Sequence, residues 1–161
     1  MVRLVPSMLV AAALVSTFWA VKPARAADPP ADPCSLLPAS DVARITGKNY
    51  NPPQSSAAPR PYANTNAGTD CTYAARGSGD QLLFRVYFDN SPAQATDLFA
   101  KLRMFYSPPT PVPGIGDDAY FDPRHAIHVR KGKVRYFLQL GDAEANQKAL
   151  SALAALVAGK L

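Results

Sequence analysis

Apolar residues at every second position mark the two longest predicted strands of this chain. In residues 81–88 every second position is apolar, and residues 133–140 repeat the pattern. This period of two is typical of a half-buried strand. Shorter strands are predicted at 71–76, 118–121 and 126–130. The turns at 77–80 and at Lys131-Gly132 would join four of the five strands into two hairpins.

Three segments instead have apolar residues spaced three or four apart, which predicts helices. The first begins with Pro38 at its first helical position and ends at Gly47. The second begins with Ser91 as N-cap, with Pro92 and Gln94 completing a capping box, and runs to about residue 105. The third runs from 143 to about 158, with Asp142 as its cap. The proline-rich residues 51–68 are predicted to form a long surface loop.

The order of these elements is helix, hairpin, helix, three strands and helix. We expect one α+β domain over residues 34–161, in which an antiparallel sheet has its helices packed on one face as a two-layer sandwich.

The first 26 residues have the pattern of a signal peptide. A basic start at Arg3 leads into an apolar run, and Ala24-Arg25-Ala26 matches the site that signal peptidase cleaves. The run is short for a membrane span, which needs about twenty apolar residues; a retained N-terminal anchor is the alternative. Residues 27–33 would be a flexible lead-in. The predicted location is periplasmic or secreted, with no stable membrane anchor after cleavage.

Removing this leader changes the charge more than the length. The 161-residue chain has a formal charge of +5 with 17 basic and 12 acidic residues, but three of the basic residues lie in the leader. The remaining formal charge of +2 is too small to indicate binding to DNA or RNA, so we expect no nucleic-acid partner.

Two cysteines, Cys34 and Cys71, follow the leader. An even pair in an oxidising compartment predicts a disulfide. A catalytic thiol is the alternative, but no histidine stands in an obvious partner motif. Residues 31–33 do not match the sequence that precedes a lipid-attachment cysteine.

One segment gathers oxygen and nitrogen donors within twelve residues: Asp117, Asp118, Asp122, His125 and His128. A divalent metal site is one interpretation of this segment. The two histidines are three residues apart, which separates them across a strand. We therefore expect solvated loop residues, no metal and no cofactor.

A second cluster is basic, and it comprises Arg124, Arg130, Lys131, Lys133 and Arg135. This hairpin is a candidate surface for an anion or an acidic partner. The alternative is that these charges keep an exposed strand soluble and block edge pairing. Four strand tyrosines (Tyr73, Tyr87, Tyr120, Tyr136) suggest either a ligand groove or ordinary packing.

No nucleophile elbow, phosphate loop, dinucleotide fingerprint or zinc-protease motif occurs in the sequence. The leading hypothesis is therefore a non-enzymatic envelope protein that binds a small ligand or a partner protein. The alternative is an envelope hydrolase with an active site in residues 117–128. An accessory subunit is a third possibility.

Several short motifs resemble a family of small exported bacterial proteins and lipoproteins that is defined only as a domain of unknown function. They are Pro33-Cys34 followed by Leu36-Leu37, then Cys71-Thr-Tyr73, and then Val112-Pro-Gly-Ile-Gly-Asp117. The resemblance implies a Cys34–Cys71 bridge and a sandwich similar to PsbP-like domains, and it carries no catalytic residues. Pro38 replaces the family's usual capping threonine.

Overall fold

The computed structural model describes residues 30–63, 65–106, 108–141 and 145–161. Its strands are β1 (Gln54–Ala58), β2 (Gly68–Ala74), β3 (Gln81–Phe88), β4 (Thr110–Pro111), β5 (Asp118–Phe121), β6 (Ile127–Lys131) and β7 (Val134–Leu140). Its helices are the short 3-10 helix η1 (Pro33–Leu36), α1 (Ala39–Thr46), α2 (Pro92–Phe105) and α3 (Gln147–Lys160). The predicted leader and the predicted cap Asp142 lie outside the described residues.

The strands form one antiparallel sheet in the order β1-β2-β3-β7-β6-β5-β4. The predicted α+β fold with an antiparallel sheet is confirmed. The central pair is β3 with β7, where Leu82 lies opposite Leu140 and Phe88 opposite Val134. This pairing joins the two predicted hairpins and aligns their alternating patterns, so that apolar positions share one face.

The prediction of a continuous loop over residues 51–68 is wrong for its middle part. β1 pairs with β2, with Ser55 opposite Cys71. It is an edge strand with four exposed residues and one buried residue. Serine, alanine and glutamine on an exposed edge give no apolar alternation, so the strand is formed by pairing with β2 and leaves little sequence signal.

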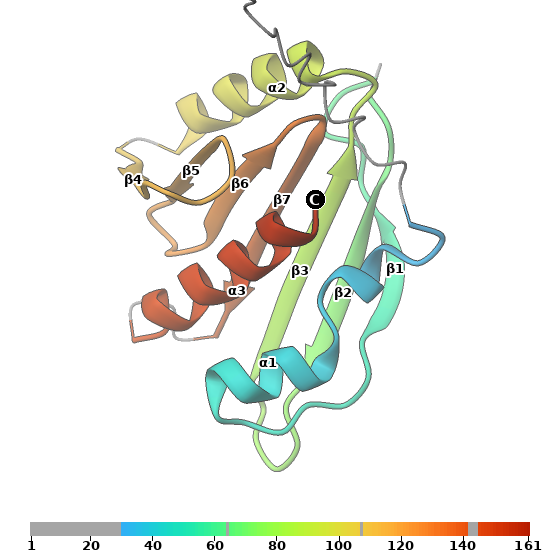
Figure 1. Cartoon of the computed structure of the whole chain (residues 1–161), viewed down its shortest axis with the longest axis vertical. Helices are drawn as coiled ribbons and strands as arrows, with labels where there is room; N and C mark the ends of the chain where they lie inside the picture. Colours follow the sequence, from blue (N-terminus) through green and yellow to red (C-terminus); the bar gives the residue numbers. More distant parts are fainter. Residues whose placement is uncertain (1–29, 64, 107, 142–144) are drawn as a thin grey trace, which may run out of the picture.

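The main core lies between one face of the sheet and the helices α1 and α3, which lie in front of the strands in Figure 1. The helix α3 contributes Leu150, Leu153, Ala154 and Val157, all fully buried. They pack with the apolar face of β3, β6 and β7, which includes Phe84, Ile127 and Leu138. The Tyr136 hydroxyl donates to the Ala154 carbonyl at 2.6 Å and ties the sheet to α3.

Whereas two of the helices share this face, α2 covers part of the opposite face. Tyr120 of β5 and His128 of β6 alternate with core residues and therefore point away from α3. The Phe99 ring of α2 packs on Tyr120 with ring centres 5.2 Å apart. Ala95, Leu98 and Phe99 are buried there, outside the main core. The result is a sandwich with a partial third layer.

The predicted Cys34–Cys71 disulfide is present, with Cα atoms 5.6 Å apart. It joins η1 to β2. The adjacent Tyr73 hydroxyl donates to the Leu37 carbonyl, and burial raises the pKa of Tyr73. The segment before α1 is therefore fixed to the sheet by a covalent bond and a hydrogen bond.

Candidate binding groove

The sheet face that α2 leaves open carries a groove of about 430 Å³. Its floor comes from β3 and β7, where the register places Leu83 opposite Gln139, Arg85 opposite Phe137, and Tyr87 opposite Arg135. The Arg85 guanidinium lies 5.2 Å from the centre of the Phe137 ring. That of Arg135 lies 5.0 Å from the centre of the Tyr87 ring. We call this cavity the sheet groove. Its floor alternates arginines with aromatic rings.

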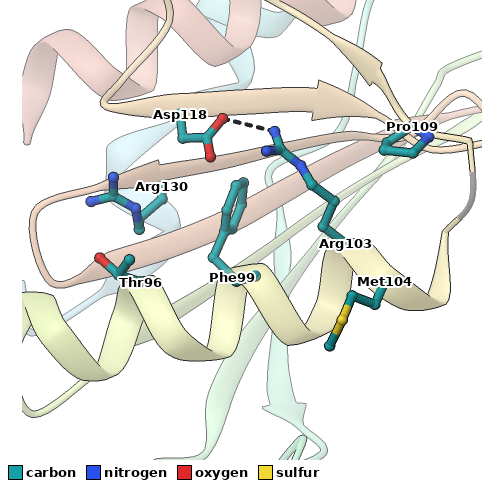
Figure 2. A pocket seen from close by; sticks show the side chains of 8 residues that line it. Thr96, Phe99, Arg103, Met104, Pro109, Asp118 and Arg130 are labelled. Carbon is teal, nitrogen blue, oxygen red and sulfur yellow. Dashed lines mark hydrogen bonds and ion pairs between the residues drawn. The ribbon is translucent and has the colours of Figure 1, made fainter.

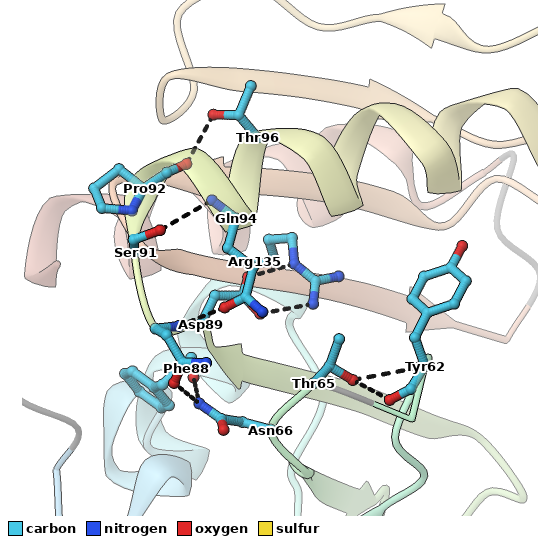
Figure 3. A network of polar contacts seen from close by, with 11 residues as sticks. Tyr62, Thr65, Asn66, Phe88, Asp89, Ser91, Pro92, Gln94, Thr96 and Arg135 are labelled. Carbon is cyan, nitrogen blue, oxygen red and sulfur yellow. Dashed lines mark hydrogen bonds and ion pairs between the residues drawn. The ribbon is translucent and has the colours of Figure 1, made fainter.

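Both floor arginines are held by carboxylates. Arg85 forms two hydrogen bonds to Asp70, one of them 2.7 Å long. Arg135 forms two to Asp89, at 2.6 and 3.0 Å, and both of these side chains are buried (Figure 3). Such two-point pairs fix the guanidinium planes and neutralise their charge. The floor is thus rigid, polar at its edges and close to neutral.

One rim of the sheet groove is the segment Pro59-Arg60-Pro61, which follows β1. The Tyr87 hydroxyl donates to the Pro59 carbonyl at 3.2 Å and holds this rim to the floor. The Tyr87 ring also lies over Gly68, where an added Cβ would come within 2.6 Å of a ring carbon. Glycine is therefore required at position 68 for the ring to adopt this position.

The opposite rim comes from α2 and from the β5–β6 turn. Leu102 and Tyr106 supply an apolar wall, and Arg124 lies with its guanidinium 6.0 Å from the centre of the Tyr106 ring. Arg60 and Arg124 are both exposed, and neither has a carboxylate partner among the described residues. These two arginines are the cations of the lining that are open to an anionic ligand.

A buried Asp122–His128 pair forms part of the same wall, with Nε2 of His128 3.1 Å from the carboxylate. The other carboxylate oxygen accepts N–H bonds from Arg124 and Ala126. Burial alone would raise the pKa of Asp122, but these hydrogen bonds hold it below its usual value. The His128 ring stacks on Tyr120, with ring centres 4.9 Å apart.

A second hollow of about 430 Å³ lies between α2 and the strands β5 and β6 (Figure 2). Arg103 of α2 crosses it and bonds Asp118 at 2.8 Å. Arg130, also on its wall, pairs with Asp117. Since Arg103 and Arg130 each already have a carboxylate partner, this hollow offers less to an ionic ligand than the sheet groove.

The structure separates most of the donors in residues 117–128. Asp117 pairs with Arg130 and Lys131, and Asp118 pairs with Arg103. His125 contacts Gln147 at the start of α3. Only Asp122 and His128 come together, and no group of three metal-ligating side chains occurs in the ranges that the structure describes.

The five residues of the predicted basic cluster lie in different environments in the structure. Arg135 is buried with Asp89, and Arg130 and Lys131 share the Asp117 carboxylate. Lys133 also has an interaction partner. Of the five residues, Arg124 and Arg135 line the sheet groove. The structure thus does not arrange the hairpin as a single open cationic surface.

The four strand tyrosines divide between the two faces of the sheet. Tyr73 and Tyr136 belong to the main core, whereas Tyr87 and Tyr120 are on the opposite face. Of the four, Tyr87 lines the sheet groove.

Arg60, Arg85 and Tyr106 are groove residues that the sequence did not single out. The alternation of residues 81–88 and 133–140 puts Arg85 on the polar face of one strand and Arg135 on that of another. The missing information was that these two strands are neighbours. Arg60 lies in a segment without periodicity and gave no signal.

A scan against models of protein families found no match to the chain, and a search of curated proteins found none either. The resemblance to small exported proteins therefore stays a prediction. Within the described part of the chain, no helix combines the length and apolar character needed to cross a bilayer.

Proposed function

We propose that this protein binds a small amphiphilic anion in the sheet groove, as an exported, non-enzymatic protein of the cell envelope. The observation that carries the proposal is the combination of an aromatic and apolar floor with two cations that lack carboxylate partners, Arg60 and Arg124. The groove volume falls within the usual range for ligand pockets, about 300–1,000 Å³. The disulfide is the support for export, because such bonds persist in oxidising compartments.

The ligand class follows from the distribution of charge. Arg85 and Arg135 are neutralised by Asp70 and Asp89, so they orient rings and do not attract a second anion. A ligand with one carboxylate or sulfonate would bind Arg60 and Arg124, and its apolar body would lie on Phe137 and Leu83. A polyanion would find too few cations here.

Isothermal titration with 2-naphthoate and its neutral counterpart, 2-naphthalenemethanol, tests the proposal. We expect saturable binding of the anion and binding at least about tenfold weaker for the alcohol, because a charge-assisted hydrogen bond contributes about 1.5–3 kcal/mol. The variant R60Q/R124Q should lose about tenfold in affinity for 2-naphthoate. The matched control R44Q/R76Q removes two exposed arginines that do not line the groove and should bind normally. Equal affinity for the two ligands, or an unaffected R60Q/R124Q protein, would contradict the proposal.

The Asp122–His128 pair favours a second candidate, a hydrolase in which this histidine activates water. No serine, threonine or cysteine is among the described residues that line the groove, so a covalent mechanism has no evident nucleophile there. Assay of ester hydrolysis by wild type and H128Q separates the two functions. Turnover that H128Q abolishes while 2-naphthoate still binds would establish the enzyme.

A further inference from the structure

The last turn of α2 exposes two large apolar side chains side by side. Met104 and Phe105 each keep 74% of their surface in solvent. The other large apolar side chain exposed in the described residues, Tyr62, retains 38%. Figure 2 shows Met104 pointing away from the strand that carries Asp118, although this residue also borders the hollow between α2 and the sheet. A contiguous patch of exposed apolar side chains is a candidate contact surface.

The surroundings of this pair are amphipathic and cationic. The next residue is Tyr106, whose ring lies near the Arg124 guanidinium. Lys101 precedes the pair on the same exposed side of the helix and forms an ion pair with Asp97. Arg60 and Arg124, on the groove bordered by Leu102 and Tyr106, add two cations without carboxylate partners in the described residues.

We propose that this tip of α2 docks on an anionic lipid bilayer, with Met104 and Phe105 in the interface and Arg60 and Arg124 facing lipid phosphates. Apolar side chains combined with nearby cations bind anionic membranes peripherally, without spanning them. The exposed apolar pair and the two nearby cations together complement the apolar and phosphate layers of an anionic bilayer. The docking does not require that the sheet groove bind a ligand.

Sedimentation with sucrose-loaded vesicles measures the docking. Anionic vesicles of phosphatidylcholine with about 30% phosphatidylglycerol are compared with vesicles of phosphatidylcholine alone, both at low salt. We expect binding to the anionic vesicles and at least a tenfold lower partition coefficient for the neutral ones. The variant M104S/F105S should lose at least tenfold in binding to anionic vesicles, because it removes the two side chains that enter the interface.

Two variants control for charge and for folding. R60Q/R124Q should weaken vesicle binding, whereas K48Q/K148Q, which removes two cations elsewhere on the surface, should weaken it much less. The unfolding midpoint of M104S/F105S should equal that of wild type, since both positions are exposed. Binding of 2-naphthoate by M104S/F105S in the absence of vesicles should be normal, which separates this proposal from the function of the groove.

Two results would overturn the docking proposal. One is the absence of sedimentation with anionic vesicles. The other is vesicle binding that M104S/F105S leaves unchanged. If binding to vesicles is absent and gel filtration shows a dimer that M104S/F105S abolishes, the surface is an interface between copies of this chain.

Discussion

Asp122 shows how one carboxylate can organise a turn and a wall of the groove together. One oxygen accepts two N–H bonds from the backbone of the β5–β6 turn, and the other faces Nε2 of His128. The sequence suggests two roles for this residue, in a turn or as a metal ligand, and the structure places it in the β5–β6 turn. It adds the contact with His128, which depends on the pairing of β5 with β6 and has no local signature.

The pH dependence of stability should report on this carboxylate. Because the folded-state pKa of Asp122 is below its usual value, its contribution is complete above a pH of about 4 and is lost as the pH falls through the folded-state value. D122N should cost about 1–3 kcal/mol of unfolding free energy at pH 7. Urea unfolding of wild type and D122N between pH 7 and 3 should show this difference shrinking in acid. The exposed D97N variant provides the baseline, and a difference that is independent of pH would refute the assignment.

At the scale of elements, α2 was the most predictable part of the chain. Its predicted first residue, Pro92, and last residue, near 105, agree with the structure. The Ser91 side chain accepts from the Gln94 N–H at 3.1 Å (Figure 3). The Gln94 side chain accepts from the Asn90 N–H. Capping is a local interaction, so the sequence alone reveals it. Which face of the sheet α2 covers depends on tertiary packing, and the local sequence pattern of the helix does not predict it.

Removing this cap should destabilise the protein measurably. S91A should lower the unfolding free energy by about 1 kcal/mol, because the Gln94 N–H loses its acceptor. T96A in the same helix is the matched control, since its hydroxyl donates to the Pro92 carbonyl and its removal leaves no N–H group unpaired. Thermal and urea unfolding of the two variants give the comparison. Equal stability of S91A and T96A would show that the cap contributes little.

The strands that the sequence predicts well are those in which apolar residues recur at every second position. β3 matches its predicted range, and β5, β6 and β7 lie within one residue of theirs. The edge strands β1 and β4 were missed because their residues are polar, small or proline and mostly exposed. The groove combines β3, β6 and β7 with α2, the segment after β1 and the β5–β6 turn, so its composition depends on the order of the strands and not on any one of them.

Over the whole molecule, the disulfide closes a separation of 37 positions between η1 and β2. The chain-entropy relation gives about 4 kcal/mol for a loop of this length, as an upper value. The C34S/C71S variant should lose up to this amount in urea unfolding. Wild type treated with a reductant should behave like the variant, which excludes a packing defect of the serines. Unchanged stability in both would mean that η1 and α1 contribute nothing to cooperative unfolding.

The position of α3 in the chain has a consequence for how the protein is made. Its four buried residues fill the main core, and Lys160 reaches back to the Leu36 carbonyl at 3.0 Å and to Asp41. Synthesis delivers this helix after every strand that it covers. Until α3 has been synthesised, the apolar face of β3, β6 and β7 lacks the four side chains that cover it. The main core can therefore form completely only after residues 147–160 have been made.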